Sequence, residues 1–388
     1  MTDQANRSPT LALNEPADSE VLTIGEIFWR DHQVWLQEQG YTLRPRYRPG
    51  WVPSWQGTDK DCWDVEDGQG LSRAVIIDAR RLRDGADVCL KKIKTKIFPF
   101  EHGLSTLLGS GPLSEDPQNH SVPILESLQV PDDESLVIIV MPLLREYCQP
   151  RFDTFGEAVD FFSQIFEGVK FLHDRNIAHR DLNATNIMMD GSKMFPDGYH
   201  PQYPKMNRDF YSGRARFYTR TQRPPKYHII DFGLSRQYDT RDPPPLEIPI
   251  VGGDKTVPEF RFTKRGKPPK PCDPFPTDIY YLGNLILREF VEGIPFVNYS
   301  NRLKGFEFMR DLAQDMTAKN PSDRPTIDEV IERFAAIRKS LNFWKLRSRV
   351  VKMRGFPDPR RPFRHWYLRI GYILRCIPAI PSYQRACQ

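Results

Sequence analysis

Two short polar segments carry the residues that are best suited to chemistry. The first runs from His179 to Asn186, follows a segment with apolar residues at helical spacing, and contains Asp181. The second follows an apolar run and supplies the carboxylate of Asp231. Carboxylate and amide oxygens suit a hard, hydrated cation such as Mg²⁺, and a carboxylate can accept the proton of a hydroxyl group. Asn186 and Asp231 are therefore candidate metal ligands, and Asp181 is a candidate base for an acceptor hydroxyl.

Phosphoryl transfer requires a bound metal ion and an aligned hydroxyl rather than covalent participation by the protein. The segments HRDLNATN from 179 and DFG from 231 resemble the catalytic loop and the magnesium-binding turn of protein kinases. Four further segments resemble kinase motifs in the expected order: Val88 to Lys91, Val257 to Glu259, Asp278 to Gly283, and Arg324-Pro325. The resemblance implies a two-lobed α+β fold, in which a small β-rich lobe precedes a larger helical lobe. It also implies transfer of the terminal phosphate of magnesium-bound ATP to a protein hydroxyl.

The resemblance to protein kinases implies that Lys91 holds the α and β phosphates of ATP and acts with Asp181 and Asn186 in catalysis. The neighbouring Lys92 could equally be a solvated surface charge, but the Val-x-x-Lys spacing on a predicted strand favours Lys91. Glu101 is the expected partner of Lys91, since EHGLSTLL contains the only plausible helix start between Lys91 and the loop before residue 120. A glutamate exposed to solvent is the alternative for Glu101.

A glycine pair precedes the first predicted strand. The segment GQGLSRAV from residue 68 fits the kinase pattern Gly-x-Gly-x-x-Gly-x-Val, with Arg73 in place of the third glycine. Backbone amides in such a loop can donate hydrogen bonds to phosphates. The resemblance therefore predicts that the nucleotide contacts, in addition to Lys91 and Glu101, the residues Gly68, Gly70, Val75, Cys89, Met141, Leu143 and Leu144.

Two departures from the family pattern concern the acceptor. Asn183 stands where serine/threonine kinases usually have a lysine, and Gly252 or Gly253 stands where they usually have a threonine. We still expect serine or threonine as the acceptor, because the stretch after Glu259 does not resemble that of tyrosine kinases. The protein substrate is not identified by the sequence.

The same departures support two alternatives to an active protein kinase. A pseudokinase would keep Asp181, Asn186 and Asp231 as structure and bind nucleotide or partners without transferring phosphate. A small-molecule kinase fits less well, because such enzymes usually have a glycine at the position of Arg180. They also lack a pair equivalent to the one expected here, which Glu259 forms with Arg324.

Hydrophobic periodicity and turn residues suggest how the chain is organised. We expect helices over 24–39, 155–175, 276–290 and 304–341, a strand over 134–142, and a hairpin that turns at Asp84-Gly85. Four features resemble those of kinase-like proteins of mushroom-forming fungi: the leading segment GEIFWRDHQVWLQEQGY, the segments NHSVPIL and VMPLL, and the long insertion before Asp231. The expected parts are a disordered arm at 1–20, an N-terminal helix and extended strap at 21–60, a small lobe at 61–142, a large lobe at 143–340 with an insertion near 191–226, and a basic aromatic tail at 341–388.

Charge is concentrated in the tail. Residues 341–388 contain eleven Lys or Arg and only Asp358 as an acid, whereas the whole chain has a formal charge of +5. The tail could therefore dock on an acidic membrane surface or on the mildly acidic remainder of the chain. The insertion near 191–226 mixes aromatic and basic residues, but we expect it to pack on its own lobe and expect no nucleic-acid partner.

Other features indicate an intracellular protein, either cytoplasmic or nuclear. No run of eighteen apolar residues is present, and the first twenty residues lack a basic start and an apolar core for export. The six cysteines have no metal-ligand spacing, which favours free thiols. In the segment after Asp231, four hydroxyl residues are candidates for phosphorylation and capture by Arg180: Ser235, Tyr238, Thr240 and Thr256.

Overall fold

The computed structural model describes residues 20–131, 133–250, 252–260, 269–293, 303–353 and 360–383. The chain forms two compact units. The N-terminal unit comprises residues 1–90 and 197–215, and the main unit comprises residues 91–196 and 216–388. The predicted disordered arm at 1–20 lies outside the described residues except for its last residue. Among the described residues, no helix is both long enough and apolar enough to cross a bilayer.

The described part of the N-terminal unit has two short helices where one helix was predicted over 24–39. Thr23 and Glu26 form a reciprocal capping box that starts the first helix, and the helical geometry is interrupted at His32. The strap that follows is irregular, as its prolines require, with single 3₁₀ turns. The elements of this unit are α1 (Ile24–Asp31), α2 (Gln33–Glu38), β1 (Tyr41–Thr42), η1 (Pro45–Tyr47), η2 (Cys62–Asp64), η3 (Glu66–Gly68) and β2 (Ile76–Arg81).

A five-stranded antiparallel sheet has the strand order β1-β2-β3-β5-β4. The predicted hairpin joins β2 to β3 (Asp87–Lys94), and Gly85 adopts a φ of 68° in its turn, which a residue without a Cβ does at little cost. Strand β5 (Leu136–Pro142) pairs with β4 (Glu126–Gln129) in the register Leu128 to Ile138. Strands thus precede the long helices, which confirms the predicted α+β order.

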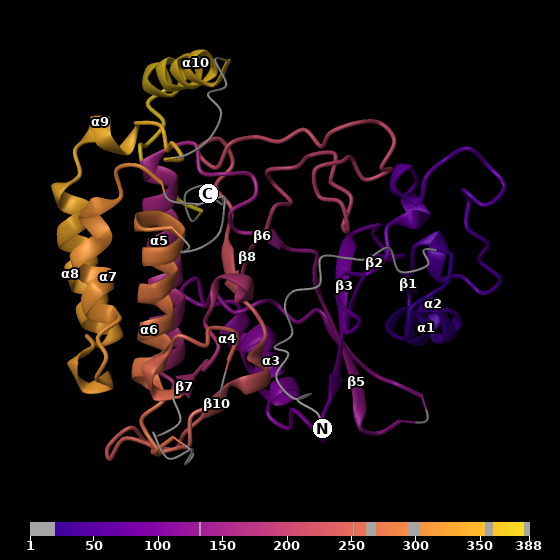
Figure 1. Cartoon of the computed structure of the whole chain (residues 1–388), viewed down its shortest axis with the longest axis horizontal. Helices are drawn as coiled ribbons and strands as arrows, with labels where there is room; N and C mark the ends of the chain where they lie inside the picture. Colours follow the sequence, from indigo (N-terminus) through magenta and orange to yellow (C-terminus); the bar gives the residue numbers. More distant parts are fainter. Residues whose placement is uncertain are drawn as a thin grey trace, which may run out of the picture. The chain divides into compact units, whose positions relative to one another are not determined.

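The main unit has a helical region, and its centre is α5 (Phe155–His173), which is buried along almost its whole length. Its neighbours α8 (Ile327–Ser340), α6 (Phe275–Ile286) and α7 (Arg310–Met316) lie side by side in Figure 1. Aromatic rings fill the core, with the ring of Phe162 4.7 Å from that of Phe290 and the ring of Phe166 5.2 Å from that of Phe334. The remaining helical elements are α3 (Glu101–Gly109), α4 (Gly111–Ser114), η7 (Leu287–Val291, a π-helical turn), η8 (Glu307–Met309), η9 (Pro321–Asp323), α9 (Phe343–Leu346) and α10 (Arg360–Leu374).

Short strands of the main unit frame the two polar segments found in the sequence. Strand β7 (Ile177–Ala178) leads into the first segment, and β8 (Ile187–Met189) follows it. Strand β9 (Tyr227–Ile229) pairs with β8 and leads into the second segment, after which β10 (Arg236–Gln237) returns to pair with β7. The two segments are therefore brought together by hydrogen-bonded strands. The turns within them are η4 (Ala184–Asn186) and η5 (Phe232–Leu234), and the remaining elements are β6 (Arg145–Glu146) and η6 (Pro258–Phe260).

Candidate active site

The structure places one lysine between two carboxylates. The Nζ of Lys91, on β3, lies 2.5 Å from Oε1 of Glu101 at the start of α3 and 2.8 Å from Oδ1 of Asp231. Asp231 adopts a left-handed conformation, with φ 67°, which is uncommon for a residue other than glycine. The next residue, Phe232, is buried with its ring 5.2 Å from the ring of His179. The turn is therefore fixed by packing, and it directs the Asp231 carboxylate to Lys91.

Burial and charge act on these three groups in opposite directions. Burial lowers the pKa of Lys91, but the charges of Asp231 and Glu101 outweigh it and hold the lysine pKa above its ordinary value. Burial raises the pKa of Asp231, but Lys91 more than compensates, so that the pKa of this carboxyl is low. For Glu101 burial prevails over Lys91, and its pKa is raised. The site favours a charged lysine and an ionised Asp231.

The carboxylate of Asp181 is held on both oxygens. Its Oδ1 accepts hydrogen bonds from Nδ2 of Asn183 (2.8 Å) and from the backbone N–H of Gly253 (2.6 Å). Its Oδ2 accepts from Nδ2 of Asn186 at 2.9 Å. Nδ2 of Asn186 also donates to the Asp181 carbonyl, at 2.8 Å. These bonds hold Asp181, Asn183 and Asn186 as one rigid group.

The two predicted departures, at Asn183 and at the glycine pair, are physically linked. A Cβ on Gly253 would lie 2.7 Å from Nδ2 of Asn183. A Cβ on Gly252 would lie 2.3 Å from the hydroxyl of Tyr281 and 2.5 Å from Oδ1 of Asp181. The backbone at residues 252–253 therefore packs against Asp181 with no room for side chains. A backbone N–H and an asparagine amide thus both donate to the same carboxylate oxygen of Asp181.

A buried aspartate accepts hydrogen bonds from the backbone of the segment that contains Asp181. Asp278, on α6, accepts hydrogen bonds from the backbone N–H groups of His179 (2.8 Å) and Arg180 (2.7 Å). It also contacts Nε2 of His173 at 3.1 Å. Arg180 has a φ of 68°, and these hydrogen bonds hold it in that conformation. The segment DIYYLG matches a kinase motif, but the sequence did not predict that Asp278 anchors the backbone of His179 and Arg180.

Glu247 is a partner of Arg180 that the sequence did not reveal. The guanidinium of Arg180 is buried and lies 3.0 Å from Oε2 of Glu247, whose other oxygen accepts from Arg236 at 3.0 Å. Two backbone hydrogen bonds between Glu247 and Cys272, of 3.1 and 2.9 Å, fix the position of the glutamate. Arg180 is therefore already paired with an acidic side chain.

The expected ion pair of Glu259 and Arg324 is present as a bidentate contact, with distances of 2.6 and 2.7 Å. Arg324 also donates to the carbonyls of Ala318 (2.9 Å) and Pro276 (2.9 Å). Both side chains are buried, so the pair is well placed to order the surrounding backbone.

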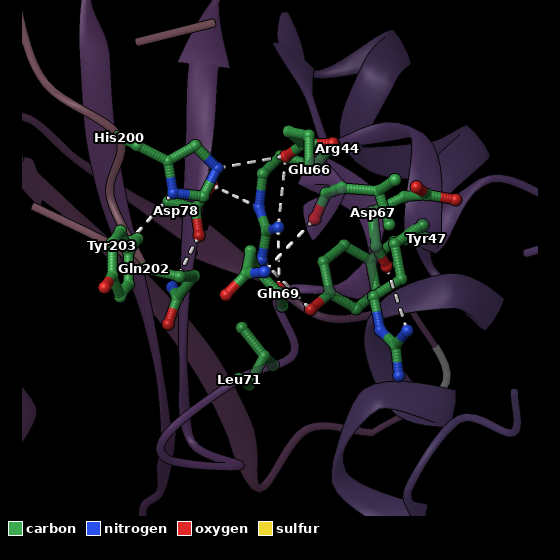
Figure 2. Close-up of polar contacts among 12 residues, drawn as sticks. Arg44, Tyr47, Glu66, Asp67, Gln69, Leu71, Asp78, His200, Gln202 and Tyr203 are labelled. Carbon is green, nitrogen blue, oxygen red and sulfur yellow. Dashed lines mark hydrogen bonds and ion pairs between the residues drawn. The ribbon is translucent and has the colours of Figure 1, made fainter. Parts of the chain in front are cut away.

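In the N-terminal unit, the predicted glycine-rich segment is tightly held by side chains. Figure 2 shows the guanidinium of Arg44 donating to Glu66 (3.2 Å), to Asp78 (2.9 Å) and to the carbonyl of Gln69 (2.8 Å). The buried carboxylate of Glu26 accepts from Arg46 and, at 3.4 Å, from the backbone N–H of Leu71.

The glycines of this segment have packing reasons of their own. A Cβ on Gly68 would lie 1.8 Å from the carbonyl oxygen of Cys62, and one on Gly70 would lie 3.1 Å from Oε1 of Glu26. Val75, directly before β2, is exposed. The close approach of the Cys62 backbone thus requires glycine at residue 68 independently of any nucleotide, and Glu26 leaves little room for a side chain at residue 70.

Part of the insertion near 191–226 packs in the N-terminal unit instead of on the lobe in which it begins. Residues 197–215 belong to that unit. His200 is buried and lies 3.2 Å from Oε1 of Glu66, while its Nδ1 accepts from the backbone N–H of Tyr203 at 3.0 Å (Figure 2). Gln202 donates to Asp78 at 2.7 Å. The contacts of His200 with Glu66 and of Gln202 with Asp78 join residues 134 and 124 positions apart, so they have no signal in local sequence patterns.

The other predicted nucleotide contacts lie on strands or directly after one. Cys89 is half-buried on β3, and Met141 is buried on β5. Leu143 and Leu144 are half-buried directly after β5. Among the described residues, no cluster of three or more His, Cys, Asp or Glu side chains could hold a metal ion. A metal ion at Asn186 and Asp231 would therefore need further ligands that are not His, Cys, Asp or Glu side chains.

Comparisons with known proteins agree with this geometry. The model of the protein kinase domain family matches residues 118–251, which include Asp181, Asn186 and Asp231. The serine/threonine-protein kinase pim-2 of Danio rerio is 22% identical over 291 residues, which cover 66% of this chain and 78% of that protein. The serine/threonine-protein kinase PTK2/STK2 of Saccharomyces cerevisiae is 27% identical over 163 residues, which cover 40% of this chain and only 17% of the yeast protein. Residues 118–251 thus match the protein kinase domain family, and the chain has distant similarity to serine/threonine kinases.

Proposed function

We propose that this chain is an active protein kinase that transfers the γ-phosphate of magnesium-bound ATP to a serine or threonine hydroxyl of another protein. The observation that carries the proposal is the convergence of Lys91 on Glu101 and Asp231. Lys91 is kept charged by these carboxylates and would hold the α and β phosphates of ATP. The similarity to serine/threonine kinases supports the choice of acceptor.

The donor atoms of Asn186 and Asp231 fit Mg²⁺. The amide nitrogen of Asn186 is committed to Asp181, so its carbonyl oxygen is the atom that remains as a ligand. Asp231 uses Oδ1 for Lys91, which leaves Oδ2. Both are oxygen ligands of the kind that Mg²⁺ prefers together with water and phosphate. When bound, Mg²⁺ would neutralise charge on the phosphates of ATP.

Asp181 would orient the acceptor hydroxyl and accept its proton as the acceptor oxygen bonds to the γ-phosphorus and the bond from that phosphorus to the ADP oxygen breaks. Its hydrogen bonds to Asn183, Asn186 and Gly253 fix the carboxylate before the substrate arrives. A fixed base of this kind contributes about 10²- to 10⁴-fold to the rate. The backbone at residues 252–253 would lie beside the acceptor, in place of the usual threonine and lysine.

The test is transfer of labelled γ-phosphate from ATP to a mixture of peptides that carry serine, threonine or tyrosine, followed by identification of the labelled amino acid. We expect phosphoserine or phosphothreonine. Label on tyrosine alone would overturn the acceptor assignment, and label on small alcohols but on no peptide would overturn the assignment to protein kinases.

A pseudokinase is the second candidate, because both carboxylate oxygens of Asp181 are already engaged and residues 252–253 pack directly against it. Nucleotide binding at saturating Mg²⁺ without any phosphate transfer would favour this candidate. The narrower resemblance to kinase-like proteins of mushroom-forming fungi stays a prediction.

A further inference from the structure

Helix α10 exposes a continuous apolar face. Phe363 and Tyr367 are each 79% exposed, and Leu374 is 78% exposed. Trp366 and Ile370 are about half exposed. The spacing of three or four residues places these side chains on one side of the helix. We call this set, Phe363, Trp366, Tyr367, Ile370 and Leu374, the α10 face.

The α10 face is exposed although the helix itself is anchored. Tyr372, on the other side of α10, is buried and its hydroxyl lies 2.7 Å from that of Thr219. The buried guanidinium of Arg347 donates to the carbonyl of Ile377, just beyond the helix. Figure 1 shows α10 beside α9 at the edge of the helical region of the main unit. The apolar face is thus held outward by contacts on the opposite side.

Positive charge accompanies this face. Residues 360–375 contain five arginines and His365, and no Asp or Glu. The guanidinium of Arg369 lies 5.0 Å from the ring of Trp344 on α9 and 4.8 Å from the ring of Trp366. The side chain of Arg364 is 52% exposed, and its nearest acid is Asp153 at 3.6 Å.

We propose that the α10 face binds the surface of an anionic lipid bilayer, with the helix lying in the plane of the interface. Tryptophan and tyrosine favour the boundary between headgroups and acyl chains, where their rings are apolar and their polar atoms are wet. A helix with such residues on one face and arginines around them is attracted by acidic headgroups. A second copy of the chain is a poorer occupant, because it would bring together two helices with five arginines each.

The experiment is sedimentation of the full chain with vesicles of phosphatidylcholine, with and without about 30% phosphatidylserine, at low and high salt. We expect binding to the anionic vesicles at least about tenfold tighter than to the neutral ones, and weaker binding as salt screens the headgroups. No sedimentation with anionic vesicles at low salt would overturn the proposal.

A matched pair of tryptophans identifies the binding surface. Trp366 and Trp63 have similar exposure, 55% and 59%, but Trp63 lies in the N-terminal unit. Trp366→Ser combined with Tyr367→Ser should raise the lipid concentration for half-binding about tenfold or more, because the apolar contact is lost. Trp63→Ser should leave it unchanged, and thermal melting checks that each variant is folded.

A second pair tests the charge. Arg364→Gln should weaken binding to anionic vesicles, whereas Lys339→Gln, at an exposed position on α8, should not. Equal binding by the wild type and the Trp366→Ser, Tyr367→Ser variant would overturn the proposal. So would a dimer in solution that depends on the α10 face, because a second copy would then cover it. Phosphate transfer is not measured here, so the outcome is independent of the proposed catalytic activity.

Discussion

The guanidinium of Arg180 lies 3.0 Å from the carboxylate of Glu247, although the two residues are 67 positions apart in the chain. Arg180 directly precedes Asp181, and its backbone is anchored to Asp278. Glu247 lies in the segment between Asp231 and Glu259, which was expected to carry phosphorylated hydroxyl groups. An acidic side chain already occupies the position in which Arg180 would capture a phosphate.

This contact predicts that the chain needs no phosphorylation of that segment for activity. Treatment with a phosphatase should leave the initial rate unchanged. Glu247→Gln should lower the rate about 10- to 100-fold, because the loss of the ion pair lets the segment shift near Asp181. Glu247→Asp should recover part of the rate.

The control is Glu292→Gln, since Glu292 is exposed and pairs with Arg310 at the surface. Full activity of Glu247→Gln would contradict the role assigned to Glu247. A wild-type rate that disappears on phosphatase treatment would show that a phosphate, and not Glu247, orders the segment.

The fit between Gly253 and Asn183 predicts an intolerance to any side chain at residue 253. Gly253→Ala places a Cβ 2.7 Å from Nδ2 of Asn183, so it should lower the rate about 10- to 100-fold by displacing the Asp181 carboxylate. Gly103→Ala, at a helical position with open space, is the matched control and should be neutral. Adding Asn183→Ala to Gly253→Ala should recover part of the rate, and no recovery would point to a different cause.

The ion pair of Lys91 and Glu101 predicts an effect on nucleotide use. Glu101→Gln removes the negative charge at 2.5 Å and leaves Lys91 with Asp231 alone. We expect kcat/KM for ATP to fall about tenfold or more, because the lysine is no longer held for the phosphates. Steady-state kinetics at varied ATP measures this, with Glu115→Gln as an exposed control. Unchanged kcat/KM would mean that Glu101 has only a structural role.

The buried contacts of Glu26 predict that the folding stability of the N-terminal unit depends on this one carboxylate. Glu26 accepts from Arg46 (2.8 Å) and from the hydroxyl of Tyr47 (3.1 Å), and all three side chains are buried. Glu26→Ala removes the buried carboxylate that neutralises the charge of Arg46, which should cost about 3 kcal/mol. Hydrogen exchange should rise across residues 62–81. Glu38→Ala, which removes an exposed glutamate from α2, should have little effect.

Asp160 predicts how stability changes with pH. It is buried on α5, and burial raises its pKa to about 8. An acid whose pKa is raised on folding stabilises the fold at low pH and loses that contribution as pH rises from about 4 through 8. Asp160→Asn should therefore gain stability relative to wild type by up to about 1.4 kcal/mol per pH unit over this range. Denaturant unfolding at pH 5 and pH 7 measures it, and an equal difference at both would contradict the raised pKa.

The main features of the candidate site could be predicted because its residues lie in short segments with local patterns. Asp181 and Asp231 come shortly after β7 and β9, Asn186 directly precedes β8, and the turn at Asp84-Gly85 leads into β3, which carries Lys91. The partner of Arg180 could not be predicted, because Glu247 sits in an irregular segment whose position depends on backbone contacts to Cys272. A single acidic residue in such a segment has no distinctive pattern.

The N-terminal unit was predicted least well. Apolar spacing predicted one helix over 24–39, but the helical geometry is interrupted at His32, whose ring stacks on that of Phe28. The glycines at 68 and 70 fit a phosphate-loop pattern, yet their immediate neighbours are Cys62 and Glu26. The pairing of His200 with Glu66 joins segments that are 134 residues apart, and no local rule finds such a contact.

The most direct test of the account is the intact mass of the purified chain before and after incubation with Mg²⁺ and ATP, beside Asp181→Asn from the same host. We predict added phosphate on the wild type and none on Asp181→Asn, together with phosphate transfer to added serine or threonine peptides by the wild type alone. Nucleotide binding without any transfer by the wild type, or equal transfer by both proteins, would contradict the role assigned to Asp181.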